Sequence, residues 1–201
     1  MKFIAGLEEL HAHYGVPSAA ALRKEAPRLT AEYRRIIAAS PFLALATVGP
    51  EGLDCSPRGD RPGELVRVLD EQTLALPDRR GNDRIDSLRN MVRDPRVALM
   101  FLVPGSGMAL RVNGAARLTA DAALCASFAV EGKAPRTVAV IAVQAVYFQC
   151  ARAVMRAGLW AAHPAPDLPT PGQILAAMTA GEVGGEDYDR AWPARAKASM
   201  W

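Results

Sequence analysis

The sequence is poor in cysteine and lacks the short motifs that mark the commonest enzyme classes. Its three cysteines, Cys55, Cys125 and Cys150, are odd in number, widely separated and without a CxxC pair. This pattern argues against a disulfide framework and a structural zinc site, and it is typical of a protein in a reducing cytoplasm. The motifs GxGxxG, GxxxxGKS/T, HExxH and GxSxG are absent. The usual signatures of dinucleotide, P-loop, metalloprotease and esterase sites are therefore excluded.

Long apolar runs and strong charge are absent as well. No segment approaches the roughly 20 apolar residues of a membrane span, and the N-terminus, which contains Glu8 and Glu9, does not resemble a signal peptide. The formal net charge is +3 over 201 residues, with no lysine- or arginine-rich run. We therefore expect neither a membrane nor a nucleic acid as a partner, and a cytoplasmic location.

The histidines do not suggest a metal site. His11 and His13 lie two residues apart, so on a helix they would point to different faces. His163 lies among prolines, and we expect it to be exposed rather than catalytic. No metal-ligand set is predicted.

Hydrophobic periodicity predicts a mainly β domain between two helical ends. We expect an N-terminal helical segment over residues 1–40, the β domain over residues 41–160, and a proline-rich connector with a helical tail over residues 161–201. The strand-like segments are 41–48, 53–56, 65–69, 74–76, 97–103, 108–120 and 136–150. Their short turns and few interrupting helices predict an antiparallel barrel of six or so strands. Gly114 breaks the alternation of its strand, which predicts a bulge or a close backbone approach.

The stretch from Leu74 to Val103 organises this domain, because it reads as a strand, a basic loop, a helix and a second strand. Ile85, Leu88 and Val92 recur at helical spacing and predict the helix. Asp83 is the expected N-cap, since a short polar side chain can accept the first unpaired N–H groups.

Arginines cluster around the expected start of this helix. Arg79, Arg80, Gly81 and Asn82 precede it, and Arg84 falls in its first turn. A helix N-terminus offers unpaired N–H groups and partial positive charge, so this cluster suits a phosphate group. The alternative is a solvated basic turn, because neighbouring aspartates offset much of the charge.

Five segments in fixed order carry a resemblance to a known family. They are PFLALATV (41–48), SPRGD (56–60), LALPDRRGNDRIDSLRN (74–90), DPRVALMF (94–101) and LRVNGAARL (110–118). This order resembles the pyridoxamine 5′-phosphate oxidase-like FMN-binding split-barrel family, and more narrowly a bacterial subgroup of related FMN-binding proteins. The resemblance covers about Pro41 to Trp160. It implies a six-stranded antiparallel split barrel of Greek-key type, and a homodimer with two FMN sites at the subunit interface.

The resemblance also implies site residues. Ser56 and Arg58 would lie on the strand that contacts the flavin, and Arg111 beside the edge of its ring. Arg79, Arg80, Asn82 and Arg84 would surround the FMN phosphate. Arg156 and Trp160 would close the site from the partner subunit, although core packing is an equal alternative for Trp160. The segment SPRGDRPG (56–63) differs from the basic flavin motif of true pyridoxamine phosphate oxidases, and Gln149 stands where the subgroup commonly has histidine. Pyridoxamine oxidation and a catalytic residue are therefore not assigned.

We read the chain as an FMN-dependent oxidoreductase of a small molecule, with NAD(P)H as a candidate electron donor. A bound cofactor would supply the chemistry for which the sequence offers no evident side-chain set. Within the same fold, the alternatives are an F420-binding or a haem-binding protein. A non-enzymatic flavin carrier is a further alternative. A nucleic-acid-binding barrel is disfavoured, because few aromatic residues lie between the basic ones.

Overall fold

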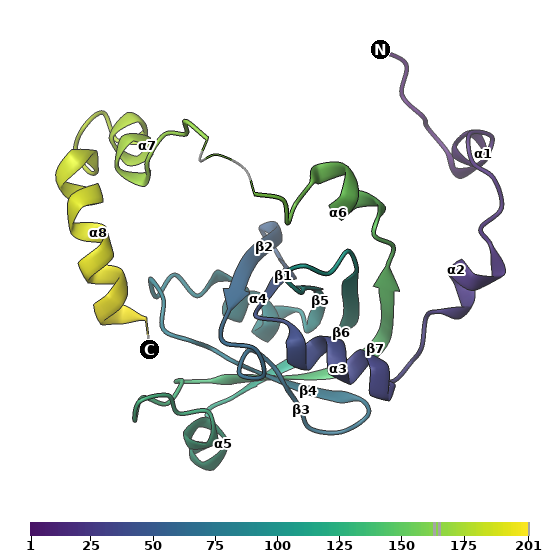
Figure 1. Ribbon diagram of the computed structural model, residues 1–201, viewed down its shortest axis with the longest axis horizontal. Helices are drawn as coiled ribbons and strands as arrows, with labels where there is room; N and C mark the ends of the chain where they lie inside the picture. Colours follow the sequence, from purple (N-terminus) through teal and green to yellow (C-terminus); the bar gives the residue numbers. More distant parts are fainter. Residues whose placement is uncertain (163, 165, 201) are drawn as a thin grey trace.

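The computed structural model describes residues 1–162, 164 and 166–200, so His163 lies outside the described residues. One antiparallel sheet with flanking helices forms the body of the protein (Figure 1). Its strands are β1 (Phe42–Gly49), β2 (Gly52–Gly59), β3 (Arg67–Val68), β4 (Thr73–Pro77), β5 (Arg96–Leu102), β6 (Ala109–Thr119) and β7 (Val138–Gln149). They are ordered β2-β1-β5-β6-β7-β4-β3. This mostly antiparallel sheet is consistent with a split-barrel fold.

The expectation of six strands is wrong, because the sheet has seven. The short strand β3 lies within the strand-like segment 65–69 and pairs with β4. Within the described residues no ladder joins the two edge strands β2 and β3, so backbone pairing leaves the sheet open. Pro57 contributes to this opening, since an edge strand that contains proline lacks one N–H group for a further strand.

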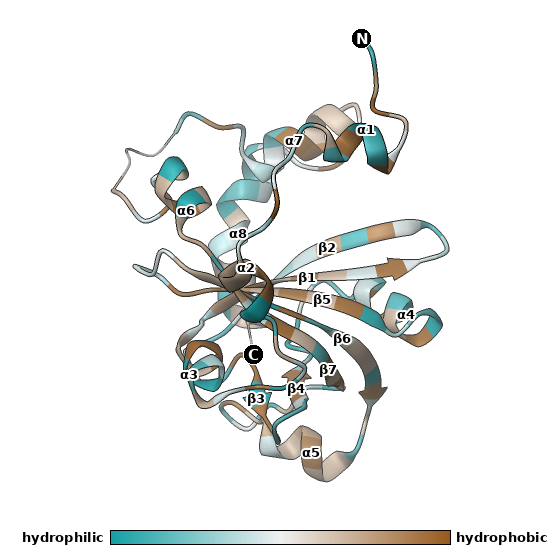
Figure 2. Cartoon of the chain, turned by 90° about the vertical axis from the view of Figure 1, so that its right-hand side faces the viewer, coloured by the Kyte–Doolittle hydropathy of each residue, from teal (hydrophilic) through white to brown (hydrophobic). Residues whose placement is uncertain are grey.

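The interior is filled by alternate side chains of the strands. In β1, Leu43 and Leu45 are fully buried, and β5 contributes Leu99 and Phe101 in the same way. Figure 2 shows these two strands side by side in the curved sheet, with hydrophobic residues recurring along β5. Helix α3 (Ala31–Ala39) adds Ile37 to this core. Apolar residues thus recur at every second position of these strands, because successive side chains of a strand point to opposite faces of the sheet.

The opposite face of the same strands carries three alanines together with larger side chains. Ala46 pairs with Ala98 in the neighbouring strand, and Ala44 pairs with Met100. These residues alternate with the core positions, so their side chains lie on the outer face. Met100 is 41% exposed there. An exposed apolar patch on a sheet is a candidate surface for association.

Gly114 is the predicted irregularity of β6. The register of β6 against β7 shifts between Asn113 and Gly114. A Cβ atom at Gly114 would lie 2.3 Å from the carbonyl oxygen of Ala142. Glycine is therefore required here by the close approach of β7, as its position in the sequence indicated.

Short helices frame the sheet, and a longer helix ends the chain. The bounds are α1 (Leu7–His11), α2 (Ala19–Arg23), α4 (Asp86–Arg93), α5 (Ala122–Ser127), α6 (Arg152–Ala157), α7 (Pro171–Met178) and α8 (Gly185–Ser199). The sequence analysis assigned no separate helix to residues 185–199, although Glu186 and Asp187 in the first turn of α8 are a helix-start signal. None of the helices among the described residues is long and apolar enough to cross a bilayer.

We predict that Gly114→Ala destabilises the protein by about 1–3 kcal/mol, because β7 must move to admit the methyl group. Thermal or urea unfolding measures this loss. The matched control is Gly59→Ala, another strand glycine, whose added Cβ would meet its neighbours only at 3.7 Å or more. An equal effect of both substitutions would contradict the role assigned to the β6–β7 approach.

Candidate functional site

The loop before α4 has a strained backbone. Asp83 and Ile85 both have positive φ, at 58° and 51°. A β-branched residue such as isoleucine rarely adopts this conformation, so the surrounding structure must hold it in place. Such strain is typical of loops that present groups to a ligand.

The helix start lies later in the chain than the sequence predicted. Ile85, not Asp83, is the N-cap of α4, and no side chain caps the helix. Asp83 lies two residues before this N-cap, and its carboxylate instead accepts a hydrogen bond from Arg136 at 3.0 Å. The N–H groups of the first turn of α4 therefore lack the side-chain cap that was expected.

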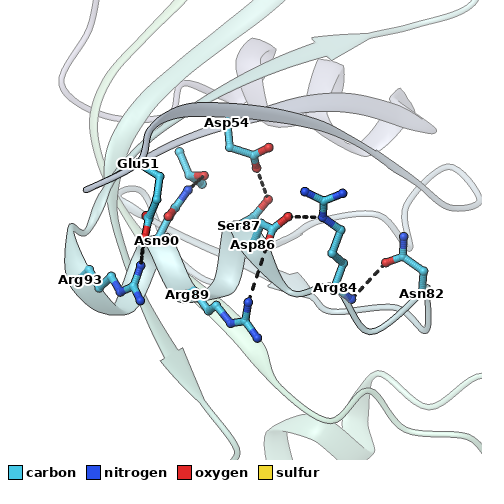
Figure 3. Close-up of polar contacts among 10 residues, drawn as sticks. Glu51, Asp54, Asn82, Arg84, Asp86, Ser87, Arg89, Asn90 and Arg93 are labelled. Atoms are coloured by element: carbon cyan, nitrogen blue, oxygen red, sulfur yellow. Dashed lines mark hydrogen bonds and ion pairs between the residues drawn. The ribbon is translucent and has the colours of Figure 1, made fainter. Parts of the chain in front are cut away.

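Arg84 is held at this helix start by local contacts (Figure 3). Its backbone N–H donates to Oδ1 of Asn82 at 3.1 Å. Its guanidinium Nε donates to Oδ2 of Asp86 at 2.5 Å. The Arg84 side chain is 79% exposed, so this ion pair is solvated and weak. An incoming anion could take over the guanidinium at little free-energy cost.

Polar side chains join the start of α4 to strand β2. The hydroxyl of Ser87, which is buried, donates to Asp54 Oδ2 at 2.8 Å and lies 2.9 Å from the hydroxyl of Ser56. Arg58 in turn donates to Ser56 Oγ at 2.9 Å. The structure thus brings the predicted residues Ser56 and Arg58 into one network with α4.

The sequence analysis missed the part that Ser87 and Asn90 play. It predicted the helix from Ile85, Leu88 and Val92, yet Ile85 is 43% and Val92 75% exposed. The buried positions of α4 are Ser87, Asn90 and Met91. The signal for this buried face was the spacing of two polar residues, Ser87 and Asn90, three positions apart on the helix.

A half-buried acidic group lies beside Arg58. Asp78 lines a small cavity of about 10 Å³ together with Arg58, Leu88 and Met91. Burial raises the pKa of the Asp78 carboxyl, while the guanidinium groups of Arg58 and Arg136 act in the opposite direction. The carboxylate of Asp83 also acts to raise the pKa of Asp78.

A groove of about 430 Å³ runs between the β1–β2 hairpin and the outer side of α4. It is lined by Glu51, Gly52, Leu53, Asp54, Arg84, Asp86, Arg89, Asn90 and Arg93. Arg93 pairs with Glu51 at 3.1 Å and Arg89 with Asp86 at 3.8 Å (Figure 3). These pairs are solvent-exposed, so the groove offers guanidinium groups that a phosphate-bearing ligand could engage.

Arg79 has a different place from the one predicted. Its Nε donates to Asp60 at 2.7 Å and one terminal nitrogen donates to the carbonyl oxygen of Phe128 at 2.6 Å. The side chains of Arg79 and Asp60 are only 14% and 1% exposed. Arg79 therefore ties the loop to the barrel, whereas Arg80 and Asn82 are exposed. The contact of Arg79 with a phosphate stays a prediction.

The other predicted residues lie elsewhere in the chain. The guanidinium of Arg111 on β6 lies 5.1 Å from the centre of the Tyr147 ring. Trp160 follows α6, is 39% exposed, and donates from Nε1 to the carbonyl oxygen of Ser106 at 2.7 Å. Core packing of Trp160 is therefore excluded. Arg156 is exposed on α6. A single chain does not bring these residues into the network at the start of α4.

Comparison with known proteins adds the following. A family model described as pyridoxamine 5′-phosphate oxidase matches residues 29–150. No curated protein matches the sequence.

Among solved structures, a variant of HupZ from Group A Streptococcus is 20% identical with a TM-score of 0.47, over 60% of this chain and 98% of that chain. A Lactobacillus delbrueckii protein provisionally named a pyridoxamine 5′-phosphate oxidase is 22% identical with a TM-score of 0.49, over 61% and 95%. A FAD-binding protein from Mesorhizobium loti is 18% identical with a TM-score of 0.43, over 62% and 96%. Similarities this distant do not extend to function.

We predict that Arg79→Ala destabilises the fold by about 3–5 kcal/mol, because it leaves the buried carboxylate of Asp60 without its ion partner. The melting temperature should fall by roughly 10 °C. Arg80→Ala is the control, since this neighbouring arginine is exposed. Equal melting temperatures of the two variants would show that the Arg79–Asp60 pair does not hold the loop.

Proposed function

Because this chain belongs to the pyridoxamine 5′-phosphate oxidase family, we propose that it binds FMN and acts as a flavin-dependent oxidoreductase on a small molecule. The observation that carries the proposal is the start of α4, where the helix lacks a side-chain cap and Arg84 lies beside it. FMN differs from riboflavin by one phosphate group, and a phosphate is the ligand that such a helix start favours.

The residues present fit this cofactor. Arg84, the exposed Arg80 and the first N–H groups of α4 supply donors for the phosphate, and Asn82 shapes the loop through its bond to Arg84. The exposed Arg84–Asp86 pair would open as the phosphate binds. Ser56 and Arg58, on the strand that packs against α4, would contact the rest of the flavin.

The side chains of the site suit binding and orientation of a cofactor rather than redox chemistry of their own. Bound FMN would supply the redox chemistry, while the protein binds the phosphate, orients the ring and tunes it through hydrogen bonds. Asp78 lines a small cavity with Arg58, and burial raises the pKa of its carboxyl. NAD(P)H is the candidate electron donor.

We further propose that the working unit is a homodimer. The alanine-rich outer face of β1 and β5, with Met100 exposed on it, is suited to pack against its own copy about a two-fold axis. Such packing would let Arg111, Arg156 and Trp160 of one subunit approach the α4 start of the other. The three free thiols, of which Cys55 and Cys150 are exposed, support a reducing compartment, and we propose the cytoplasm.

We predict that Arg84→Ala weakens FMN binding by roughly ten- to a hundredfold, the effect of losing one charge-assisted phosphate contact. Riboflavin binding should change little. Fluorescence titration with both flavins measures the difference. Arg28→Ala is the matched control, since Arg28 is also an exposed arginine, pairs with Glu71 and does not line the groove beside α4. Equal affinity of the wild-type protein for FMN and riboflavin would refute the phosphate site.

The absorbance spectrum of the purified protein tests the cofactor itself, because flavin, deazaflavin and haem absorb differently. An anaerobic titration with NADH and NADPH then separates an enzyme from a carrier. An enzyme should be bleached by a donor and restored by an acceptor. A carrier should resist reduction and release FMN readily to an apo-flavoprotein.

For assembly, we predict that the FMN-loaded protein scatters light as a dimer of about 43 kDa, twice the 21.5 kDa of one chain. Dilution should release FMN and subunits together, because a shared site links the two equilibria. A monomer that retains one FMN per chain would contradict a site shared between subunits.

A further inference from the structure

The C-terminal helices α7 and α8 form a hairpin of defined shape. Asp189 of α8 accepts hydrogen bonds from the hydroxyl of Thr170 at 2.5 Å and from the N–H of Gly172 at 2.8 Å. Thr170 and Gln173 also form a capping box. A Cβ atom at Gly184 would lie 2.4 Å from the carbonyl oxygen of Gly172, so the two segments approach backbone to backbone. This hairpin is held by polar contacts and glycine packing.

The same hairpin has no hydrophobic core of its own. Gly172 is its one buried residue among those described between residues 166 and 200. Most of its large apolar side chains are 49–80% exposed, whereas Leu175 and Tyr188 are half-buried; the exposed ones are Ile174, Met178, Val183, Trp192 and Met200. A unit of this size without buried apolar side chains does not reach useful stability alone. It therefore needs a surface on which to bury this face.

The barrel of the same chain does not provide that surface. Figure 1 shows α7 and α8 set apart from the sheet, at the end of a connector that leaves α6. Within the described part of the chain, the extensive helix contacts of α7 and α8 are with each other. The segment 161–170 joins α6 to the hairpin and contains Pro164, Pro166 and Pro169, a composition typical of a linker.

A matching surface lies around α6. Its members, which we call the α6 patch, are Met108, Phe148, Met155, Leu159 and Trp160, each 37–74% exposed. They lie at one end of the molecule, because Leu110 pairs with Phe148 and Trp160 bonds to Ser106. Gly107 also approaches Ala151 so closely that a Cβ there would lie 2.9 Å from the alanine methyl. The patch is thus apolar and built on a packed loop and helix.

Charge distinguishes the two surfaces and makes them complementary. Glu182 lies in the turn between α7 and α8, and Glu186 and Asp187 lie in the first turn of α8, where both form solvent-exposed ion pairs with Arg190. The α6 patch is flanked by Arg152 and Arg156, which are exposed and have no ion pair within the described residues. The exposed Glu182 beside one apolar face is therefore complementary in charge to Arg152 and Arg156 beside the other.

We propose that the α7–α8 hairpin of one chain docks on the α6 patch of a second copy of the same chain. This inference rests on the homodimer of the proposed function, and it assigns the exposed apolar face of the hairpin to that partner. In a two-fold dimer the contact occurs twice. The hairpin of each subunit would contact helix α6 of the partner, and that α6 would lie over the cofactor site of the subunit to which the hairpin belongs. The hairpin would then fix the positions of Trp160 and Arg156 of the partner.

A photo-crosslink in the full-length protein tests the contact. p-Benzoylphenylalanine replaces Met178, which is 80% exposed on α7. Irradiation should yield a product of twice the chain mass, with crosslinked peptides from residues 152–160. The same crosslinker in place of Leu53, which is 88% exposed at the β1–β2 turn, should give no product with those peptides.

A second substitution probes the patch itself. Met155→Glu removes an apolar contact and places a negative charge opposite the acidic turn, so it should lower the yield of the Met178 crosslink by roughly tenfold. Val92→Glu on α4 is the matched control and should leave the yield unchanged. Crosslinks confined to single chains, crosslinks to other segments, or an unchanged yield in Met155→Glu would each overturn the inference.

Light scattering and the flavin spectrum of the same preparation separate this inference from the proposed function. A dimer that contains FMN but gives no crosslink between residues 178 and 152–160 refutes the docking of the hairpin alone. A monomer without FMN refutes both the docking and the proposed function.

Discussion

The polar packing of α4 against the β1–β2 hairpin is the constraint on which the candidate site depends. Ser87 bonds to Asp54 and lies against Ser56, while Asn90 donates to the hydroxyl of Thr47 at 3.1 Å. Each such bond contributes about 1 kcal/mol net, but leaving one of these buried groups unpaired would cost more. The helix can therefore rotate or slide only by breaking several bonds at once. Its start is fixed relative to β2 for that reason.

The strain of the preceding loop follows from this fixed position. The chain must pass from the end of β4 to the start of α4 within a few residues, and it does so with positive φ at Asp83 and Ile85. The buried Arg79–Asp60 pair anchors one end of the loop and α4 anchors the other. Arg80, Asn82 and Arg84 are left exposed between the two anchors, as a phosphate-binding loop requires. Preorganisation of this kind reduces the ordering that a ligand must induce.

The residues of the proposed site lie in two separate regions of one chain. Exposed apolar surfaces would bring these regions together if they packed against a second copy. The outer face of the sheet, the α6 patch and the α7–α8 hairpin are all apolar and exposed. Arg111 and Trp160 belong to these regions, whereas Arg84 and Arg58 belong to the α4 start. A second copy of the chain is the simplest partner that would cover the apolar areas and unite both groups of residues.

Local patterning in the sequence was sufficient for much of the fold. Alternation in β1 and β5 predicts strands because one face of a pleated sheet must be apolar, and Gly114 predicts a close approach because no side chain fits there. Charge and spacing also predicted a basic loop before a helix. Tertiary structure alone decided the rest. Ile85 and Val92 face outward because Ser87 and Asn90 find buried hydrogen-bond partners on β1 and β2, which lie far away in the sequence. Arg79 turns to Asp60, and Arg80 does not, because only the folded barrel places a buried carboxylate beside one of two adjacent arginines. Local propensity acts over a few residues, whereas these choices depend on contacts between segments that only the folded chain brings together.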